Sequence, residues 1–323
     1  MLAVFATRLS KDDPLSGLRI ADHPEPEVPG GWTTVRIRAA ALNHHDIWSL
    51  RGVGLDAGEL PRILGCDGAG VDADGNDVIV HAVIGDPAAA AGDETLDPNR
   101  SILSERYDGT FAEVVAVPRR NLVPKPSWLG WAEAACLPTA WLTAYRMLFT
   151  RSGLPPSGAT VLIQGAGGGV STAVILLAKA AGHTVFATSR SATKRERAAA
   201  LGADEVFEPG ARLPGRVDAV METVGEATWA HSLRSLRPGG VVVVSGSTSG
   251  PNPPADLQRM FFRQLSVVGS TMGTRDELEA LVAFLGETGV RPLVDDARPR
   301  GDARPAFEQM AAGDVFGKLI LTV

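Results

Sequence analysis

The second half of the chain alternates short apolar runs with longer segments of helical periodicity. From Thr160 onward the apolar runs are continuous, which is typical of parallel strands buried on both faces. Helices are predicted between them at Val170–Ala181, Thr193–Leu201 and Ala227–Leu236. The predicted strands are Thr160–Gln164, Thr184–Thr188, Glu205–Phe207, Val217–Met221, Gly240–Ser245 and Leu265–Gly269. This alternation predicts a doubly wound parallel α/β sheet of the nucleotide-binding kind.

The first part of the chain carries a different pattern. The segments Val35–Ala41, Asp77–Val83 and Phe111–Val117 alternate or cluster β-branched residues, with Gly and Pro between them. These short strands predict a compact β-rich domain. Near the C-terminus the pattern predicts the helices Arg275–Gly286 and Ala303–Ala312 and a closing strand, Lys318–Val323.

A Pro-bearing stretch, Asn121–Ser127, separates the β-rich part from a helix-like run between Leu129 and Phe149. We therefore expect a β-rich domain at residues 1–122 and a nucleotide-binding domain at residues 123–270. Residues 271–323 are expected to return to the first domain. A chain of 323 residues is longer than a typical single domain, so more than one domain is expected.

Composition narrows the function classes. The formal net charge of -6 and the absence of a basic stripe argue against a nucleic-acid partner. Cys66 and Cys136 are the only cysteines, which excludes a disulfide framework and favours a reducing compartment, so we expect a cytoplasmic protein. No run of 18 apolar residues and no basic, apolar leader occur, so neither a membrane span nor secretion is expected.

The strongest local motif lies between the first two strands of the predicted sheet. Four glycines, Gly165, Gly167, Gly168 and Gly169, fall within five residues and are followed by a helix that starts near Val170. Backbone N–H groups without intervening side chains can approach a pyrophosphate, whose charge a helix N-terminus favours. The motif predicts a dinucleotide site, and a tight turn without a ligand is the alternative.

The end of the second predicted strand bears on the choice of cofactor. An NAD-specific fold usually carries Asp or Glu there, to bind the ribose 2′-hydroxyl. This chain carries Ser189 and Arg190, and Lys194 and Arg195 follow. Cations at this place favour the 2′-phosphate of NADPH, although they could also be ordinary solvated charges at a helix start.

Further segments carry a resemblance to a known family. They are ALNHHDIWSLRG (41–52), LGCDGAG (64–70), DGTFAEVVAVP (108–118), LPTAWLTAY (137–145), LRPGGVVVVSG (236–246) and VVGSTMGT (267–274). With the Gly-rich turn, they resemble the medium-chain dehydrogenases/reductases, specifically the zinc-free quinone oxidoreductase branch. The resemblance implies a GroES-like β-rich catalytic domain plus a Rossmann nucleotide-binding domain, and a homodimer joined at the last strand of the sheet. Ser171 departs from the family's last glycine in the phosphate turn.

The zinc-ligand positions of the alcohol dehydrogenases in the same family can be compared with the residues of this chain, to test whether it binds zinc. Asn43 stands where their first ligand cysteine would be, and Cys66 where their ligand histidine would be. The segment Gly85–Arg100, which corresponds to their structural-zinc lobe, has no cysteine. We therefore expect no metal. An unorthodox site made of Cys66, Asp67, His44 and His45 stays open as the alternative.

Without a metal as Lewis acid, a conjugated acceptor is the easier substrate, because hydrogen-bond donors suffice to stabilise its developing negative charge. The resemblance implies a catalytic role for Asn43 as a hydrogen-bond partner of the cofactor or of the substrate carbonyl. It also implies a role for His45 as a proton donor, and the alternative is that His45 only contacts the cofactor or lies exposed on a loop. Trp48 could form a flat wall for the substrate or pack in the core. The expected cofactor-binding residues are Asn43, His44, Thr139, Thr143, Gly165, Gly167, Gly168, Gly169, Val170, Ser189, Arg190, Lys194, Thr223, Ser245, Gly246, Ser247, Gly269, Ser270, Thr271 and Lys318.

These observations lead to one hypothesis and two alternatives. The hypothesis is an NADPH-dependent reductase that transfers hydride to a quinone or an α,β-unsaturated carbonyl without zinc. The alternatives are a zinc-dependent alcohol dehydrogenase and a non-catalytic NADPH-binding or sensor module. The sequence does not identify the natural acceptor.

Overall fold

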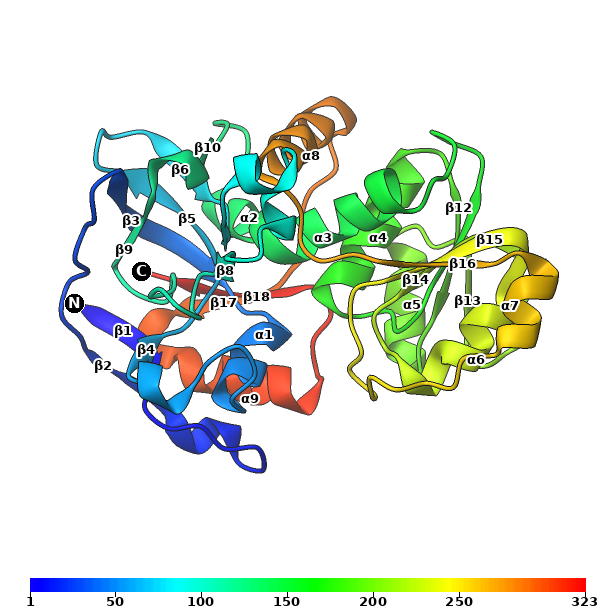
Figure 1. Cartoon of the computed structure of the whole chain (residues 1–323), viewed down its shortest axis with the longest axis horizontal. Helices are drawn as coiled ribbons and strands as arrows, with labels where there is room; N and C mark the ends of the chain where they lie inside the picture. Colours follow the sequence, from blue (N-terminus) through cyan, green and yellow to red (C-terminus); the bar gives the residue numbers. More distant parts are fainter. The chain divides into compact units, whose positions relative to one another are not determined.

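The computed structural model describes all residues, 1–323, which form two compact units (Figure 1). The first comprises residues 1–140, 274–282 and 291–323, and the second comprises residues 141–273 and 283–290. The first unit thus extends beyond the expected boundary at residue 122, because helix α2 (Trp131–Ala135) packs on strands β3 (Trp32–Ala41) and β5 (Asp67–Asp72). Of the C-terminal segment, residues 274–282 and 291–323 lie in the first unit, whereas residues 271–273 and 283–290 lie in the second.

The first unit is built on a seven-stranded, mostly antiparallel sheet. Its strand order is β10-β6-β5-β3-β18-β17, and β9 also pairs with β3. The remaining strands of this sheet are β6 (Asp77–Val80), β9 (Val114–Pro118), β10 (Leu122–Pro124), β17 (Val294–Pro299) and β18 (Lys318–Thr322). Strand β18 pairs with β3, so the C-terminus of the chain completes the sheet that its N-terminal part begins.

Smaller elements surround this sheet. A three-stranded sheet has the order β2-β1-β4, and β7 pairs with β8. Their bounds are β1 (Leu2–Ala6), β2 (Leu18–Asp22), β4 (Arg62–Ile63), β7 (Val83–Ile84) and β8 (Ser101–Ile102), and the helices are α1 (His44–Leu50), α8 (Arg275–Thr288, shared between the units) and α9 (Ala303–Ala312). The β-rich, GroES-like domain predicted from the sequence is confirmed.

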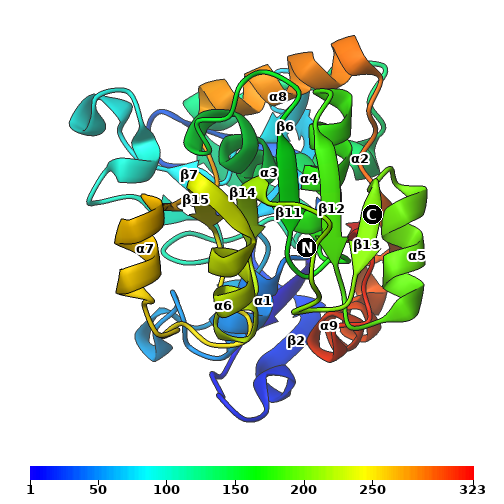
Figure 2. The ribbon, with the colours of Figure 1, turned by 90° about the vertical axis from the view of Figure 1, so that its right-hand side faces the viewer.

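The second unit is a six-stranded parallel sheet with the order β13-β12-β11-β14-β15-β16, as a Rossmann sheet requires. Figure 2 shows β15, β14, β11, β12 and β13 side by side. The strands are β11 (Thr160–Ile163), β12 (Thr184–Thr188), β13 (Glu205–Phe207), β14 (Val217–Glu222), β15 (Leu236–Val244) and β16 (Ser266–Gly269). All six predicted strands are therefore present, with ends shifted by a few residues.

Helices cover both faces of this sheet. They are α3 (Leu142–Tyr145), α4 (Gly169–Ala180), α5 (Ala192–Ala200), α6 (Glu226–Ser235) and α7 (Leu257–Arg263). Leu162, Val220 and Val242 from three adjacent strands pack with Trp229 and Leu233 of α6. Each fully buried side chain of this kind contributes roughly 1.5–3 kcal/mol, so the apolar runs that predicted the strands also hold the sheet to its helices.

The structure differs from the prediction at three helical segments, of which α7 was not predicted at all. Helix α1 was not predicted, although Asn43 and Asp46 form a capping box at its start. The predicted run from Leu129 to Phe149 is helical, but between α2 and α3 its turns widen at Leu137–Trp141. Pro138 has no N–H to donate there, which explains the irregular turn.

Candidate functional site

The phosphate turn of the second unit is shaped to admit a ligand close to its backbone. Gly165 and Gly167 have φ angles of 74° and 132°, which side chains rarely adopt. A Cβ on Gly165 would lie 2.6 Å from Val224 Cγ2. Helix α4 begins at Gly169, so its N-terminal N–H groups lie beside the turn. Backbone donors without side chains fit the pyrophosphate of a dinucleotide.

Ser171 takes part in this turn. Its hydroxyl donates to the Gly168 carbonyl at 2.9 Å and accepts the N–H of Gly167 at 3.1 Å. The serine is therefore accommodated, because its side chain is buried within the turn and hydrogen-bonded there. It also occupies one N–H that a bound phosphate could otherwise use.

The phosphate turn is tied to the end of the second strand. The N–H of Ala166 donates to the Thr188 carbonyl at 2.7 Å, and the N–H of Gly165 donates to Thr188 Oγ1 at 3.3 Å. Ser189 and Arg190 follow directly, with Ser189 buried and Arg190 exposed. Lys194 lies in the first turn of α5. The structure thus brings the predicted cationic segment next to the predicted phosphate turn.

The other predicted cofactor residues of this unit follow strand ends. Thr223 follows β14, Ser245 and Gly246 follow β15, and Ser270 follows β16. In a parallel sheet these ends share one edge, where ligands bind. Ser270 Oγ is buried there without a hydrogen-bond partner in the chain. The further predicted positions Thr143, Val170, Ser247, Gly269 and Thr271 belong to the same unit.

Glu222, which was not among the predicted site residues, organises this edge. It is fully buried, and its carboxylate accepts the N–H groups of Val224 and Gly225 at 2.8 and 3.1 Å. It also accepts the hydroxyls of Thr228 and Ser232 at 2.9 and 2.6 Å. The carboxylate therefore fixes the turn between β14 and α6. An acidic residue that ends an apolar strand was the available signal.

The predicted residues of the first unit converge on a buried cluster. The Lys318 ammonium, 2 % exposed, donates to the Leu42 carbonyl at 2.7 Å, to Asn43 Oδ1 at 2.6 Å and to Asp67 Oδ2 at 3.0 Å. Asn43 Nδ2 donates to the same Asp67 oxygen at 2.8 Å. An ammonium has three hydrogens, so these acceptors saturate it. Each hydrogen of the Lys318 ammonium thus has an acceptor within the unit, and its cofactor contact stays a prediction.

Asp46 lies beside this cluster. Its carboxylate accepts the N–H groups of Asn43 at 2.8 Å and Gly65 at 3.0 Å. Burial raises the pKa of Asp46 to about 7, against the opposing effect of the hydrogen bond from Asn43. The Asn43 amide is thus oriented from several sides, with its oxygen toward Lys318 and its nitrogen toward Asp67.

The positions that correspond to zinc ligands contact one another but do not fit a zinc ion. Cys66 Sγ lies 3.5 Å from Asn43 Nδ2 and 3.3 Å from Thr139 Oγ1. Burial, with Asp67 and Asp46 nearby, raises the pKa of the Cys66 thiol, so the thiol is neutral at pH 7 when no metal is bound. Amide and hydroxyl groups complete no tetrahedral Cys/His set. Across residues 1–323, no three His, Cys, Asp or Glu side chains gather in a metal-binding arrangement.

The remaining catalytic candidates lie on or next to helix α1. His45 Nε2 lies 3.4 Å from Ser49 Oγ and 3.8 Å from Glu105 Oε1. Burial lowers the pKa of His45 to about 4, so the ring is neutral at pH 7 and can donate an N–H bond but carries no imidazolium proton. Trp48 is partly exposed on the same helix, and His44 begins it.

Buried polar contacts hold the segment that corresponds to the structural-zinc lobe. His81 Nε2 lies 3.2 Å from Glu94 Oε1, and the N–H of Arg275 donates to the same oxygen at 2.7 Å. Burial lowers the pKa of His81. Asp97 accepts the N–H of Asp86 at 2.8 Å. Side-chain hydrogen bonds thus order this segment without cysteines.

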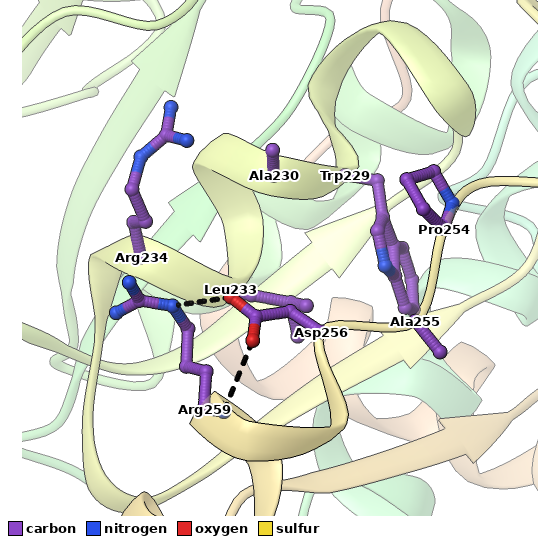
Figure 3. Close-up of a pocket in the computed structure, with 8 residues that line it drawn as sticks. All are labelled: Trp229, Ala230, Leu233, Arg234, Pro254, Ala255, Asp256 and Arg259. Carbon is purple, nitrogen blue, oxygen red and sulfur yellow. Dashed lines mark hydrogen bonds and ion pairs between the residues drawn. The ribbon is translucent and has the colours of Figure 1, made fainter.

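A separate cavity of about 260 Å³ lies between α6 and α7 of the second unit (Figure 3). Trp229 and Leu233 form its apolar wall, and Asp256 and Arg259 are paired at 3.0 Å on its rim. None of the predicted site residues lines it. It is therefore not the site that the sequence predicts.

Comparison with known proteins agrees with this architecture. Residues 29–127 match the alcohol dehydrogenase GroES-like domain, and residues 169–287 match the zinc-binding dehydrogenase model. The chain is 31% identical to a synaptic vesicle membrane protein VAT-1 homolog from Mus musculus, over 92% of this chain and 78% of that protein. The chain belongs to the medium-chain dehydrogenase/reductase superfamily.

Other members of this superfamily extend the comparison. A crystal structure of an NAD-dependent alcohol dehydrogenase superposes with a TM-score of 0.91, at 34% identity and with complete coverage of both chains. A crotonyl-CoA carboxylase/reductase from Cereibacter sphaeroides is 27% identical over 96% of this chain and 84% of its own. As a member, the protein is an oxidoreductase with a GroES-like and a Rossmann domain. No helix of the structure has the length and apolar character that crossing a membrane demands.

Proposed function

We propose that this oxidoreductase uses NADPH to reduce a quinone or an α,β-unsaturated carbonyl without zinc. One observation carries the proposal: the Lys318 ammonium bonds to Asn43 and Asp67 where zinc-dependent relatives hold their metal, although Asp67 Oδ1 is buried without a hydrogen-bond partner. A chain that lacks a Lewis acid is suited to acceptors whose conjugation already spreads the developing charge.

Bound NADPH would supply the hydride. The residues that would hold it are those of the phosphate turn and of the strand ends in the second unit, because they present backbone N–H groups and hydroxyls. Arg190 favours NADPH over NADH, since its exposed guanidinium can neutralise a 2′-phosphate. The carboxylate that would bind a free 2′-hydroxyl is missing from this place.

In the first unit, the side chains are proposed to shape the substrate site and to donate a hydrogen bond to the substrate. His45 is proposed to donate a hydrogen bond to the acceptor oxygen as a neutral imidazole. Lys318 and Asp67 hold the Asn43 amide in one orientation, so Asn43 is proposed to shape the site more than to bind the cofactor. The partly exposed ring of Trp48 offers an apolar wall to a planar acceptor.

Assembly and location are part of the proposal. We propose a cytoplasmic homodimer in which β16 pairs with its copy, because β16 ends the sheet and pairs only with β15. Val267 on this strand is 41% exposed, and Phe261 and Phe262 on α7 are 65% and 71% exposed. An unpaired apolar edge of this kind favours association.

Steady-state turnover tests the function. The purified protein is mixed with a panel of quinones, enones and simple aldehydes and alcohols, and cofactor absorbance is followed with NADPH and with NADH. The proposal predicts reduction of the conjugated acceptors with a preference for NADPH. Oxidation of alcohols alone would favour the alcohol dehydrogenase alternative, and tight NADPH binding without turnover would favour a sensor module.

A further inference from the structure

The turn between β12 and α5 contains two arginines that the structure uses differently. Arg190 is exposed, and its guanidinium makes no hydrogen bond or ion pair within the chain. Arg195 lies on α5, one turn further on, and its side chain is only 19% exposed. One cation is therefore available to a ligand, while the other is engaged.

The contacts of Arg195 are with the backbone of the turn itself. Its Nη1 donates to the Ser189 carbonyl at 2.7 Å and to the Arg190 carbonyl at 3.3 Å. Its Nη2 donates to Glu208 Oε1 at 3.3 Å. One planar guanidinium thus joins two successive carbonyls, and this restricts the backbone that carries the Arg190 side chain.

Other bonds fix the same turn relative to the phosphate turn. The N–H of Ser189 donates to the Phe207 carbonyl at 3.1 Å, and the N–H of Ser191 donates to Ser189 Oγ at 3.3 Å. Ser191 Oγ caps α5 by accepting the N–H of Lys194 at 3.3 Å. Since Ala166 bonds to Thr188, the start of this turn is held beside the glycines.

We propose that Arg195 is a positioning residue for recognition of the cofactor's 2′-phosphate. Its guanidinium clamps the carbonyls of Ser189 and Arg190, so that the backbone that carries the Arg190 side chain is ordered before binding, which lowers the entropic cost of recognition. This inference rests on the proposed use of NADPH and deepens it. Glu208, 75% exposed, holds the far end of the clamp and contributes little, because solvent screens an exposed ion pair.

The test compares two ligands that differ only in the 2′-phosphate. Binding of adenosine 2′,5′-bisphosphate and of adenosine 5′-monophosphate is measured by calorimetry, which does not depend on reductase activity. The variants are Arg190→Ala, Arg195→Ala, Arg195→Lys and Glu208→Gln. Arg216→Ala is the matched control, since Arg216 is an exposed arginine that precedes β14 and so lies at the amino ends of the strands, whereas Arg190 follows the carboxyl end of β12.

The wild-type protein is expected to prefer the bisphosphate. Arg190→Ala should lower this preference by about tenfold or more, the effect of losing a charge-assisted contact. Arg195→Ala should lower it by about three- to tenfold, with affinity for the monophosphate changed by less than about twofold. Arg195→Lys should lower the preference by less than Arg195→Ala, because the lysine ammonium ends one bond short of the position of Nη1 and has no second nitrogen to reach Glu208. Glu208→Gln and Arg216→Ala should retain the preference.

The outcomes separate the clamp from the cofactor proposal. A wild-type protein that binds both ligands equally contradicts the proposed NADPH preference and the clamp with it. A second outcome is that the wild type prefers the bisphosphate, Arg190→Ala abolishes this preference and Arg195→Ala retains it. The proposed preference for NADPH would then be supported, and the positioning role of Arg195 would be wrong. Equal loss of affinity for both ligands in Arg195→Ala would indicate a general structural role and also contradict the clamp.

Discussion

At the scale of single residues, Lys318 shows how a side chain can acquire its role from distant segments. Its three acceptors come from the end of β3 and the start of β5, about 250 to 275 positions earlier in the chain. The family resemblance implied a cofactor contact for Lys318, and a lysine at the start of a C-terminal strand gives no sign of these partners. Tertiary structure alone reveals that this ammonium is saturated.

Lys318→Met should destabilise the protein by about 3–5 kcal/mol, because Asp67 would keep a buried carboxylate without its cation. Urea unfolding measures the difference. Lys179→Met is the control, since the Lys179–Asp204 pair is more than a third exposed on average and should be worth less than about 1 kcal/mol. Adding Asp67→Leu to Lys318→Met should recover stability. Equal losses in both lysine variants would contradict the assignment.

Ser171 permits a second prediction at this scale. Ser171→Ala frees the Gly167 N–H for a phosphate, so the dissociation constant for NADPH should fall by about two- to tenfold. Thr172→Ala is the matched control, because Thr172 Oγ1 donates only to the carbonyls of Gly168 and Gly169 and its removal frees no N–H. Weaker NADPH binding by Ser171→Ala, measured by fluorescence titration, would show that the hydroxyl supports the ligand instead.

At the scale of elements, α1 links the buried cluster to the candidate catalytic residues. Asp46 in its first turn accepts the N–H of Asn43, and His45 and Trp48 lie on the same helix. A change at Asp46 therefore acts on both the cluster and the helix start. Because the pKa of Asp46 is raised, its contribution to the free energy of unfolding should change with pH and can be measured.

The stability of the wild type relative to Asp46→Asn should fall as pH rises from about 4 to about 7. Because burial raises the pKa of Asp46 from 3.8 to about 7, the folded state binds this proton more tightly than the unfolded state in that interval. A raised carboxyl pKa thus contributes stability at low pH that is lost as the pH approaches 7. Urea unfolding of both proteins across this range provides the measurement, and a pH-independent difference would contradict it.

Elements with strong periodicity were predictable, and short capped ones were not. The Rossmann strands were found because each is a continuous apolar run between turns, as in Val217–Glu222. Helix α1 escaped prediction because its seven residues, His44–Leu50, are too few to establish a helical period. Glu222 was missed because its role depends on donors from α6 and the preceding turn, which only the folded chain brings to it.

At the scale of the whole molecule, the exposed edge of the second unit predicts assembly. Val267→Asp should convert the dimer to a monomer, because two-fold pairing of β16 would bring like charges together across the new sheet. Light scattering at micromolar concentration reports the mass. Val28→Asp, at a 50% exposed valine of the first unit, should leave the dimer intact. A wild-type protein that is monomeric would refute the pairing.

The superfamily explains the arrangement of domains, while the cluster around Lys318 bears on what distinguishes this member. Relatives named as zinc-type enzymes are similar to this chain, yet the side chains at the two corresponding positions here are the amide of Asn43 and the neutral thiol of Cys66. The account therefore depends on chemistry that proceeds without a metal ion.

Metal analysis combined with turnover tests that claim most directly. The purified protein is dialysed against a chelator, its zinc content is determined by elemental analysis, and NADPH-dependent reduction of an enone or quinone is measured before and after dialysis and after zinc is restored. The account predicts substoichiometric zinc and unchanged turnover at every stage. Stoichiometric zinc, with activity lost on chelation and recovered on its return, would contradict it.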